Sequence, residues 1–354
     1  MVLSKIDWIL VLPATVILAL GVLVLRSVAP ELVTTQLIFV LVSVIAFIIF
    51  SHIDFDILFS LHNFLYVFSL IFLILPFVLG DVIRGTHRWI PLGGSTLQPS
   101  EIIKPFLLIT FSNLTVKKGA TNLLRFIFQA VIPVGIILLQ PDLGTALVLL
   151  VGTMICLFFR LHTRQLIALG LAALIFLPVG YKYILRDYQR ERLLTFINPY
   201  HDPLGQGYHV IQSTIAVGSG QFLGRGLGQG TQSQLRFLPE RHTDFIFASL
   251  TEELGFAGGI VIIIGYFIIL WRIYRLYSQV RNVPAGVFCL ASGGLIAFQV
   301  FVNIGMNIGV APVTGITLPL LSYGGSSLLS MGITLGILNS ISTYSGKSGV
   351  NYSA

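Results

Sequence analysis

Arg88 and Trp89 stand together in the segment 80–98, between two long apolar stretches of the sequence. An arginine beside an aromatic residue can simply anchor the chain at a membrane surface. It can equally hold an anionic headgroup, because a guanidinium matches phosphate oxygens with two parallel hydrogen bonds. With Arg190 and Arg192, Arg88 could therefore form a binding site for a pyrophosphate. Both interpretations stay open at this point.

Glu101 and Lys104 are charged residues near the start of an apolar helix expected over 100–116. A helix of that length spans about 25 Å, less than the roughly 30 Å of bilayer hydrocarbon, so both residues should lie below the surface. Three positions apart, they share a helix face and can form an ion pair. The pair could serve a function or only stabilise the helix start. Pro105 predicts a kink that opens space beside it.

The block 238–247 brings polar residues to the point where a polar loop meets the next apolar segment. Four of them are Glu240, Arg241, His242 and Asp244, with aromatic residues following. We expect Asp244 in the first turn of the coming helix. One alternative is that Thr243 or Asp244 only caps that helix. The other is that this cluster at a membrane mouth carries the chemistry.

Two further groups of polar residues are expected to have mainly structural roles. Glu252 and Glu253 follow about two turns deeper and need cationic or backbone partners; Lys104 is a candidate for one of them. Asn303 and the run 322–327 put small and polar residues at the ends of the last two apolar segments. Close helix packing explains them at least as well as function does. Gln98-Pro99 and Gln140-Pro141 each predict a proline at the first helical position, with an acid in the first turn.

The composition indicates whether these residues lie in a soluble protein or in a membrane protein. Hydrophobic residues make up 55% of the chain and charged residues 10%, and the mean hydropathy is +0.91. Charged residues are about 25% of a soluble domain, so this chain cannot cover a soluble globule with polar surface. We predict an all-α, polytopic integral membrane protein, a single domain over 1–354. Its ten expected spans are 8–28, 32–50, 59–79, 100–116, 124–139, 142–160, 165–184, 244–271, 285–308 and 322–342.

The short loops set the orientation, because cytoplasmic loops carry the excess of lysine and arginine. With the N-terminus inside, ten such residues are cytoplasmic: Lys5, Lys117, Lys118, Arg125, Arg160, Arg164, Arg272, Arg275, Arg281 and Lys347. Three are outside: Arg26, Arg84 and Arg88. Both termini are therefore expected in the cytoplasm and the large polar loop, 185–243, outside. Within that loop, the segment 187–194 is charged on one side and apolar on the other, and the spacing of Tyr208, Ile211 and Ile215 predicts a short interfacial helix. The net charge of +7 is mostly topological, and nucleic acid is not invoked.

Several kinds of site are not indicated. Cys156 and Cys289 lie in separate apolar spans, which argues against a disulfide or a metal site. The sequence has no Walker-A pattern, and the glycines of 218–230 form a turn-rich connector rather than a dinucleotide fingerprint.

Taken together, the polar motifs resemble those of the SEDS family (shape, elongation, division and sporulation), and most of all its cell-elongation members. The resemblance covers essentially the whole chain. Its motifs are Gln98-Pro99-Ser100-Glu101 with Lys104, Gln140-Pro141-Asp142-Leu143-Gly144-Thr145, Asp202-Pro203-Leu204-Gly205 with Gly207-Tyr208, Gly230-Thr231-Gln232-Ser233, the block 238–247 with Glu252-Glu253, Leu318-Pro319-Leu320, and Ser322-Tyr323-Gly324-Gly325. Arg241 favours the elongation type, because division-type relatives commonly have a small residue there.

The resemblance implies a peptidoglycan glycosyltransferase that polymerises lipid II, an undecaprenyl-pyrophosphate-linked disaccharide-pentapeptide, during elongation and cell-shape maintenance. It implies the bacterial cytoplasmic (inner) membrane, with the active site on the outer face. The implied partners are a class B penicillin-binding protein that cross-links the strand, other proteins of the elongation complex, and membrane lipids.

The family's essential aspartate falls on Asp244, which could act as the general base on the attacking sugar hydroxyl. Cations must stabilise the leaving pyrophosphate. The residues expected at the substrate are Arg88, Glu101, Lys104, Asp142, Arg190, Arg192, Glu240, His242 and Ser322. A divalent cation, Mg²⁺ or Mn²⁺, could assist near Asp244, although the sequence shows no recognisable set of metal ligands.

A lipid II flippase is the competing hypothesis, and a pure scaffold for the penicillin-binding protein is a third. Intramembrane charges and a lateral cavity suit a transporter nearly as well, and composition does not separate the two. A flippase, however, needs polar groups through the full depth of the bilayer. Here the sharpest polar cluster lies at the outer mouth.

Overall fold

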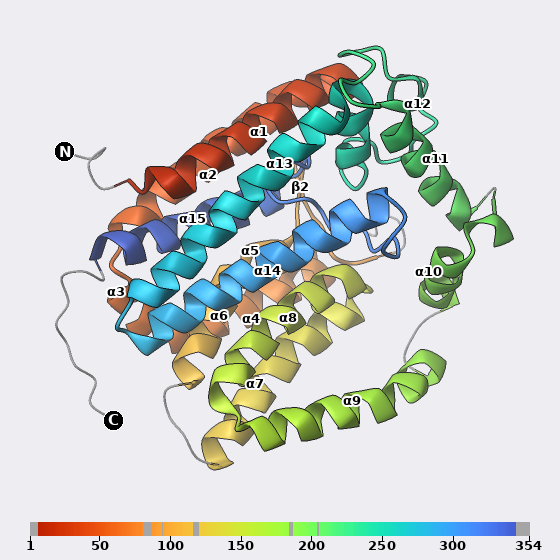
Figure 1. Ribbon diagram of the computed structural model, residues 1–354. Helices are drawn as coiled ribbons and strands as arrows, with labels where there is room; N and C mark the ends of the chain where they lie inside the picture. Colours follow the sequence, from red (N-terminus) through yellow and green to blue (C-terminus); the bar gives the residue numbers. More distant parts are fainter. Residues whose placement is uncertain are drawn as a thin grey trace.

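The computed structural model describes residues 6–80, 86–93, 95–115, 120–183, 187–203 and 205–344. Each of the ten expected spans coincides with helix in a bundle (Figure 1). The long helices are α1 (Trp8–Val28), α2 (Val33–His52), α4 (His62–Leu79), α6 (Lys104–Leu114), α7 (Ala120–Leu139), α8 (Leu143–Arg160), α9 (Thr163–Tyr183), α13 (Ile246–Gln279), α14 (Val283–Asn307) and α15 (Gly325–Tyr344). Short helices precede three of them: η2 (Pro30–Leu32), α3 (Phe55–Ser60) and α5 (Pro99–Ile102).

Six helices in the described ranges are long and apolar enough to cross a membrane by length and composition. The predicted fold class, an all-α polytopic membrane protein, is confirmed. One small departure is a two-stranded antiparallel hairpin, β1 (Ile90–Leu92) and β2 (Ser95–Leu97). Of the residues counted for the orientation, Lys5, Arg84, Lys117, Lys118 and Lys347 lie outside the described residues.

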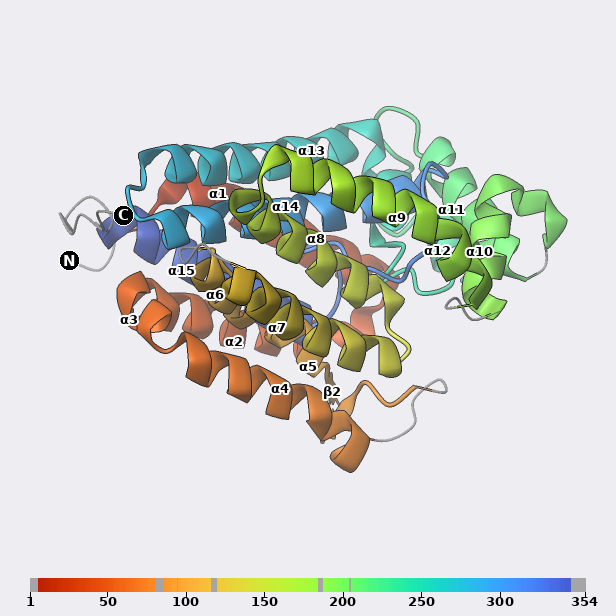
Figure 2. The ribbon, with the colours of Figure 1, turned by 90° about the horizontal axis from the view of Figure 1, so that it is seen from below.

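The polar segment 185–243 folds into short helices at one end of the bundle: α10 (Asp187–Ile197), η3 (Pro199–His201), α11 (Gln206–Ser219) and α12 (Thr231–Gln234). The short helix expected around Tyr208, Ile211 and Ile215 is present as α11. α1 begins and α15 ends at the opposite end of the bundle (Figures 1 and 2). The glycine-rich connector also forms as expected, with Gly224, Gly226 and Gly228 in the left-handed region that favours glycine.

The acids of α13 take their hydrogen bonds from this connector and from α12. The carboxylate of Glu252 accepts the backbone N–H groups of Gln232 and Ser233, at 2.8 and 2.9 Å. That of Glu253 accepts the N–H of Gly228 at 3.2 Å and the hydroxyl of Ser27. The suggestion that Lys104 pairs with one of these acids is wrong. Backbone N–H groups and side-chain donors such as the Ser27 hydroxyl hold them instead, and these hydrogen bonds attach the connector to the bundle.

Two helix starts near the hairpin differ from each other. Pro99 opens α5 with Glu101 in its first turn, as expected, and the helix is interrupted at Ile103 before Pro105. This break in the helix lies where the kink was predicted. At the second motif the expectation is wrong: Asp142 is the N-cap of α8 and accepts the N–H of Thr145 at 3.1 Å. Pro141 accordingly lies before the helix, because the aspartate side chain takes the capping role.

Small residues let the helix backbones approach closely, as membrane packing requires. Among the described residues, the most extensive helix pairing joins α2 and α15. The hydroxyl of Ser43 donates to the carbonyl of Leu328 at 2.7 Å. A Cβ added at Gly332 would collide with the carbonyl oxygen of Ser43. The absence of a side chain at Gly332 thus sets the distance between these two helices.

Gly332→Ala is expected to destabilise the protein by about 1–3 kcal/mol, because the new methyl forces α15 away from the backbone of α2. The measurement is the thermal midpoint of the detergent-purified protein. Gly135→Ala in α7 is the matched control, since a Cβ there meets nothing within 4 Å. Equal midpoints for both variants would contradict this packing account.

Candidate active site

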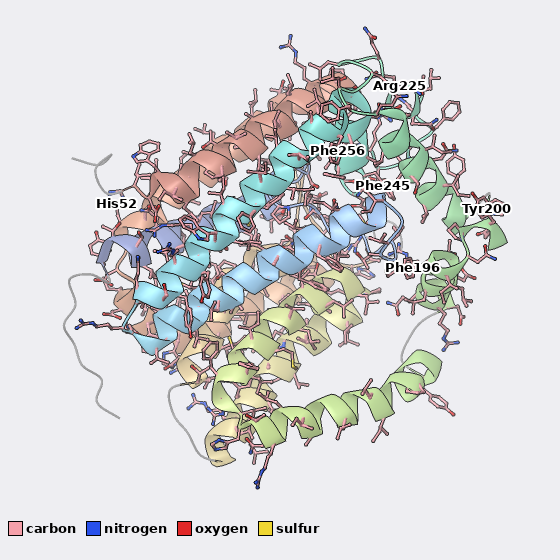
Figure 3. The ribbon with its side chains drawn as sticks, in the orientation of Figure 1. His52, Phe196, Tyr200, Arg225, Phe245 and Phe256 are labelled. Carbon is pink, nitrogen blue, oxygen red and sulfur yellow. The ribbon has the colours of Figure 1, made fainter. Side chains whose placement is uncertain are left out.

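A cavity of about 900 Å³ opens at the end of the bundle that carries α10 and α11. Its walls come from segments far apart in sequence, including the β1–β2 hairpin, the start of α8 and the loop 312–317. Seven of the ten predicted site residues line it: Arg88, Glu101, Asp142, Arg192, Glu240, His242 and Asp244. Figure 3 marks this end by Phe245, which follows Asp244, and the opposite end by His52.

Asp244 lies two residues before α13, whose N-cap is Phe245. The expectation that Asp244 falls in the first turn is therefore wrong. The capping alternative is also wrong, because the N–H of Ala248, the third residue of the helix, donates to Oδ1 of Asn307 at 3.0 Å. That N–H is the one an N-cap side chain would normally accept. A side chain from α14 caps α13 instead.

Asn303 and Asn307 also fix the backbone of Asp244. Their side-chain amides donate to its carbonyl at 3.0 and 3.1 Å. On the far side of the carboxylate, a Cβ at Gly315 would lie 3.7 Å from Oδ2, and Gly315 has a φ of +74°. The left-handed backbone favours glycine. The cavity wall therefore stays open beside the carboxylate.

Ser322 is buried and does not line the cavity. Its hydroxyl donates to the carbonyl of Thr243 at 2.7 Å and accepts the N–H of Leu318 at 2.8 Å. Its own backbone N–H donates to the carbonyl of Leu318 at 2.9 Å, which closes the turn 318–322. Ser322 thus holds the backbone that presents Asp244, rather than facing the cavity.

His242 is held through both its backbone and its ring. Its carbonyl accepts the N–H of Tyr323 at 2.9 Å, and its ring meets the Tyr323 ring edge-on with centroids 5.7 Å apart. The hydroxyl of Thr243 donates to Oε2 of Glu240 at 3.2 Å. The polar block 238–247 is therefore a compact turn, and Glu240, His242 and Asp244 reach the same cavity from it.

Asp142 and Arg88 both line the cavity and form an ion pair, with Nη1 of the arginine 3.8 Å from Oδ1 of the aspartate. The Asp142 carboxylate also accepts Gln98 Nε2 at 2.6 Å and the hydroxyl of Thr145 at 2.9 Å. Its oxygens are thus largely used by the protein. The Arg88 side chain is 27% exposed. Its guanidinium lies over the Trp89 ring and has an Nε without a hydrogen-bond partner. Arg88 therefore keeps donors for an anion.

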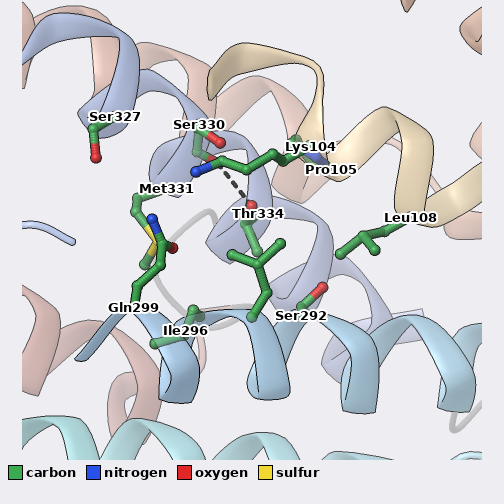
Figure 4. A pocket seen from close by; sticks show the side chains of 11 residues that line it. Lys104, Pro105, Leu108, Ser292, Ile296, Gln299, Ser327, Ser330, Met331 and Thr334 are labelled. Carbon is green, nitrogen blue, oxygen red and sulfur yellow. Dashed lines mark hydrogen bonds between the residues drawn. The ribbon is translucent and has the colours of Figure 1, made fainter. Parts of the chain in front are cut away.

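Glu101 and Lys104 form the expected ion pair, with Nζ 2.8 Å from Oε2. Glu101 reaches the large cavity, whereas Lys104 does not line it. Lys104 lies instead over a separate cavity of about 10 Å³, beside Ser330 of α15 and above Gln299 of α14 (Figure 4). Lys104 can therefore act on a ligand in the large cavity only through Glu101.

The two arginines of α10 have different surroundings. Arg190 pairs with the exposed Asp187 at 3.4 Å and does not line the cavity, whereas Arg192 does. His209 of α11 lines it as well, and sequence reasoning missed it. The helical spacing around Tyr208 marked only the apolar positions. Burial and the nearby Arg192 lower the pKa of His209, and Glu240 acts in the opposite direction.

Metal binding receives no support from ligand clustering. Across the described ranges, no three or more His, Cys, Asp or Glu side chains converge in a way that could hold an ion. We therefore derive no chemical step through a divalent cation.

Lys104→Met is expected to destabilise the protein by about 3–5 kcal/mol, because it leaves the Glu101 carboxylate buried without its cation. The double variant Glu101→Gln/Lys104→Met should recover most of this loss. Thermal midpoints in detergent measure both. Arg190→Met, which breaks an exposed pair of the same spacing, is the control and should change little. A double variant no more stable than Lys104→Met would contradict the pairing.

Comparisons with known proteins agree on one family. A family model described as "cell cycle protein", covering FtsW, RodA and SpoVE, matches residues 3–347. The peptidoglycan glycosyltransferase MrdB of Escherichia coli K12 is 40% identical over 293 residues, which are 79% of this chain and 77% of that protein. Stage V sporulation protein E of Bacillus subtilis is 40% identical over 291 residues, 78% of this chain and 77% of the relative.

Solved structures give the same result. A chain from a peptidoglycan synthase complex, studied for its coordination of polymerization and crosslinking, superposes with a TM-score of 0.82 at 35% identity. The rod shape determining protein RodA of Thermus thermophilus superposes with a TM-score of 0.71 at 30% identity. Each alignment covers 96% of this chain and 98% of the other.

Proposed function

The chain belongs to the FtsW, RodA and SpoVE family, and on that premise we propose that it is a peptidoglycan glycosyltransferase that polymerises lipid II, with Asp244 as the general base. The activity expected from the sequence agrees with the names of the relatives, which include peptidoglycan glycosyltransferases. The role of each residue is our inference from the cavity.

The observation that carries the proposal is one cavity that holds both a carboxylate and cations. Asp244 lines it together with Arg88 and Arg192. Its volume of about 900 Å³ lies near the top of the range of ligand pockets, roughly 300–1,000 Å³. A sugar pyrophosphate needs both kinds of group, one to accept a proton and the other to bind the leaving anion.

In the proposed reaction, the carboxylate and the arginines of the cavity have different roles. The Asp244 carboxylate accepts the proton of the acceptor sugar hydroxyl as the hydroxyl oxygen attacks the anomeric carbon of the donor. A new glycosidic bond forms, and the bond from the anomeric carbon to the pyrophosphate oxygen breaks. The lipid pyrophosphate leaves with the electron pair, and Arg88 and Arg192 stabilise its charge through paired hydrogen bonds.

Other residues of the site act by position. Asn303, Asn307 and Ser322 hold the backbone of the turn, so the carboxylate meets a hydroxyl in a fixed geometry. The Glu101–Lys104 pair supports the cavity wall from below. Asp142 orients Arg88 and Gln98 rather than contacting the sugar.

The protein is a multi-pass membrane protein, and we propose the bacterial cytoplasmic membrane with both termini inside and the cavity on the outer face. The count of lysine and arginine in the short loops supports this orientation. We further propose a class B penicillin-binding protein as partner, together with other elongation proteins. The likeness to a chain from a peptidoglycan synthase complex supports a cross-linking partner.

Transport of the lipid precursor fits the cavities less well. A flippase must carry a polar headgroup through the whole bilayer. Below the ion pair, the cavity under Lys104 has a volume of about 10 Å³, which is about the space that one water molecule needs. The large cavity therefore favours reaction at one end of the bundle over passage through it.

Asp244→Asn is expected to keep the fold and to lower polymer formation by about 10²–10⁴-fold, the usual contribution of a general base. The assay gives purified protein, with its penicillin-binding protein, labelled lipid II in detergent, where no leaflet exists to flip across. Asp187→Asn on α10, whose side chain is 94% exposed, is the matched control. Undiminished glycan chains from Asp244→Asn would contradict its role. Absence of chains from the unaltered protein would favour transport or scaffolding.

A further inference from the structure

We propose that His209 is a further substrate-binding residue, which joins Arg192 in holding the pyrophosphate and takes up a proton as that anion binds. The inference rests on the proposed function. It extends the substrate-binding site to α11, which lies outside the block 238–247 that contains Asp244. His209 and Arg192 come from neighbouring helices of the polar segment 185–243. Both line the cavity that contains Asp244.

The His209 ring has a fixed place beside the proposed base. It lies against the ring of Phe245, with centroids 6.2 Å apart and planes inclined by 31°. Phe245 follows Asp244 directly and is buried. Tyr208 meets the same imidazole edge-on, with centroids 6.3 Å apart. The imidazole is therefore positioned by packing at the wall of the site.

One ring nitrogen is available for a ligand. Nδ1 of His209 is buried and has no hydrogen-bond partner in the protein. Buried polar atoms are nearly always hydrogen-bonded, so a buried nitrogen of a cavity-lining residue points to a ligand. A protonated imidazole donates from both nitrogens, so Nδ1 can then donate to a phosphate oxygen.

The charges around His209 determine when it is protonated. Arg192 on α10 disfavours the imidazolium, as burial does, while Glu240 in the turn before α13 favours it. Asp244 is the other carboxylate of that turn in the same cavity, and the loop 312–317 contributes no titratable side chain. A bound pyrophosphate adds negative charge beside the ring and offsets the positive charge of Arg192. Both effects favour the imidazolium.

Protonation of His209 makes the affinity for the anion depend on pH. The pKa of His209 is lowered in the free site and is raised when the anion binds, so binding takes up a proton between these two values. Affinity for the anion is greatest below the free-site pKa, and it falls as pH rises through the bound-site pKa. Because the free-site pKa is lowered, this window begins below the ordinary histidine value of about 6.5. Relative to a variant that lacks the imidazole, we expect the affinity of the unaltered protein to fall by about tenfold from pH 6 to pH 8.

The test is calorimetry of farnesyl pyrophosphate binding to the purified full-length protein in detergent. Titrations at pH 6, 7 and 8, in buffers of different ionisation enthalpy, give the affinity and the number of protons taken up. His209→Gln should bind with a smaller proton uptake and a flatter pH dependence. His162→Gln, an exposed histidine outside the cavity, should behave like the unaltered protein. Farnesol, which lacks the phosphates, should show no difference between the proteins.

Proton uptake and pH dependence in His209→Gln equal to those of the unaltered protein would overturn the proposal. So would failure of the unaltered protein to bind the probe while it polymerises lipid II. If His209→Gln does not fold, His209→Asn serves in the same titrations. Asp244→Asn separates the two claims: it should retain the proton uptake and lose polymerisation. Polymerisation by Asp244→Asn would count against the base assignment and leave the His209 proposal standing.

Discussion

The hydrogen bonds that Asn303 and Asn307 make with the start of α13 are the constraint on which the site depends. Asn307 is a bridge: its amide nitrogen donates to the carbonyl of Asp244, while its oxygen accepts the N–H of Ala248. A single side chain thus caps α13 and fixes the residue before it. In a site of low dielectric such hydrogen bonds are strong, and a partner lost is costly. The position of the Asp244 carboxylate therefore follows from the packing of α14 against α13.

A second consequence concerns the other charges of the bundle. Glu101 has Lys104, and Glu252 and Glu253 have backbone and hydroxyl donors. These carboxylates are held by partners within the protein, and the one oxygen among them that is buried without a hydrogen bond, Oε2 of Glu253, does not line the cavity. Arg88 and His209 differ, because each keeps a buried nitrogen without a hydrogen bond at the cavity wall. The groups whose partners lie within the protein form the frame of the site. Arg88 and His209 are groups that can still bind a substrate.

The sequence allowed the fold to be predicted because long apolar runs in a bilayer can only be helices. Local spacing likewise predicted the Glu101–Lys104 pair and the kink at Pro105. The contacts of Ser322, Asn307 and His209 could not be predicted in this way. Each depends on a partner from a distant segment, as when Ser322 binds the carbonyl of Thr243. Helix periodicity also carries no signal for a polar residue such as His209 that faces a cavity.

The central claim is that the cavity seats the reacting sugars with a hydroxyl at Asp244. An experimental structure of Asp244→Asn in detergent with trapped lipid II tests it most directly. The account predicts a sugar hydroxyl about 2.6–3.2 Å from the side chain of residue 244, with the pyrophosphate on Arg88 and Arg192. A saccharide bound outside this cavity, or a residue 244 side chain that faces no hydroxyl, would contradict it.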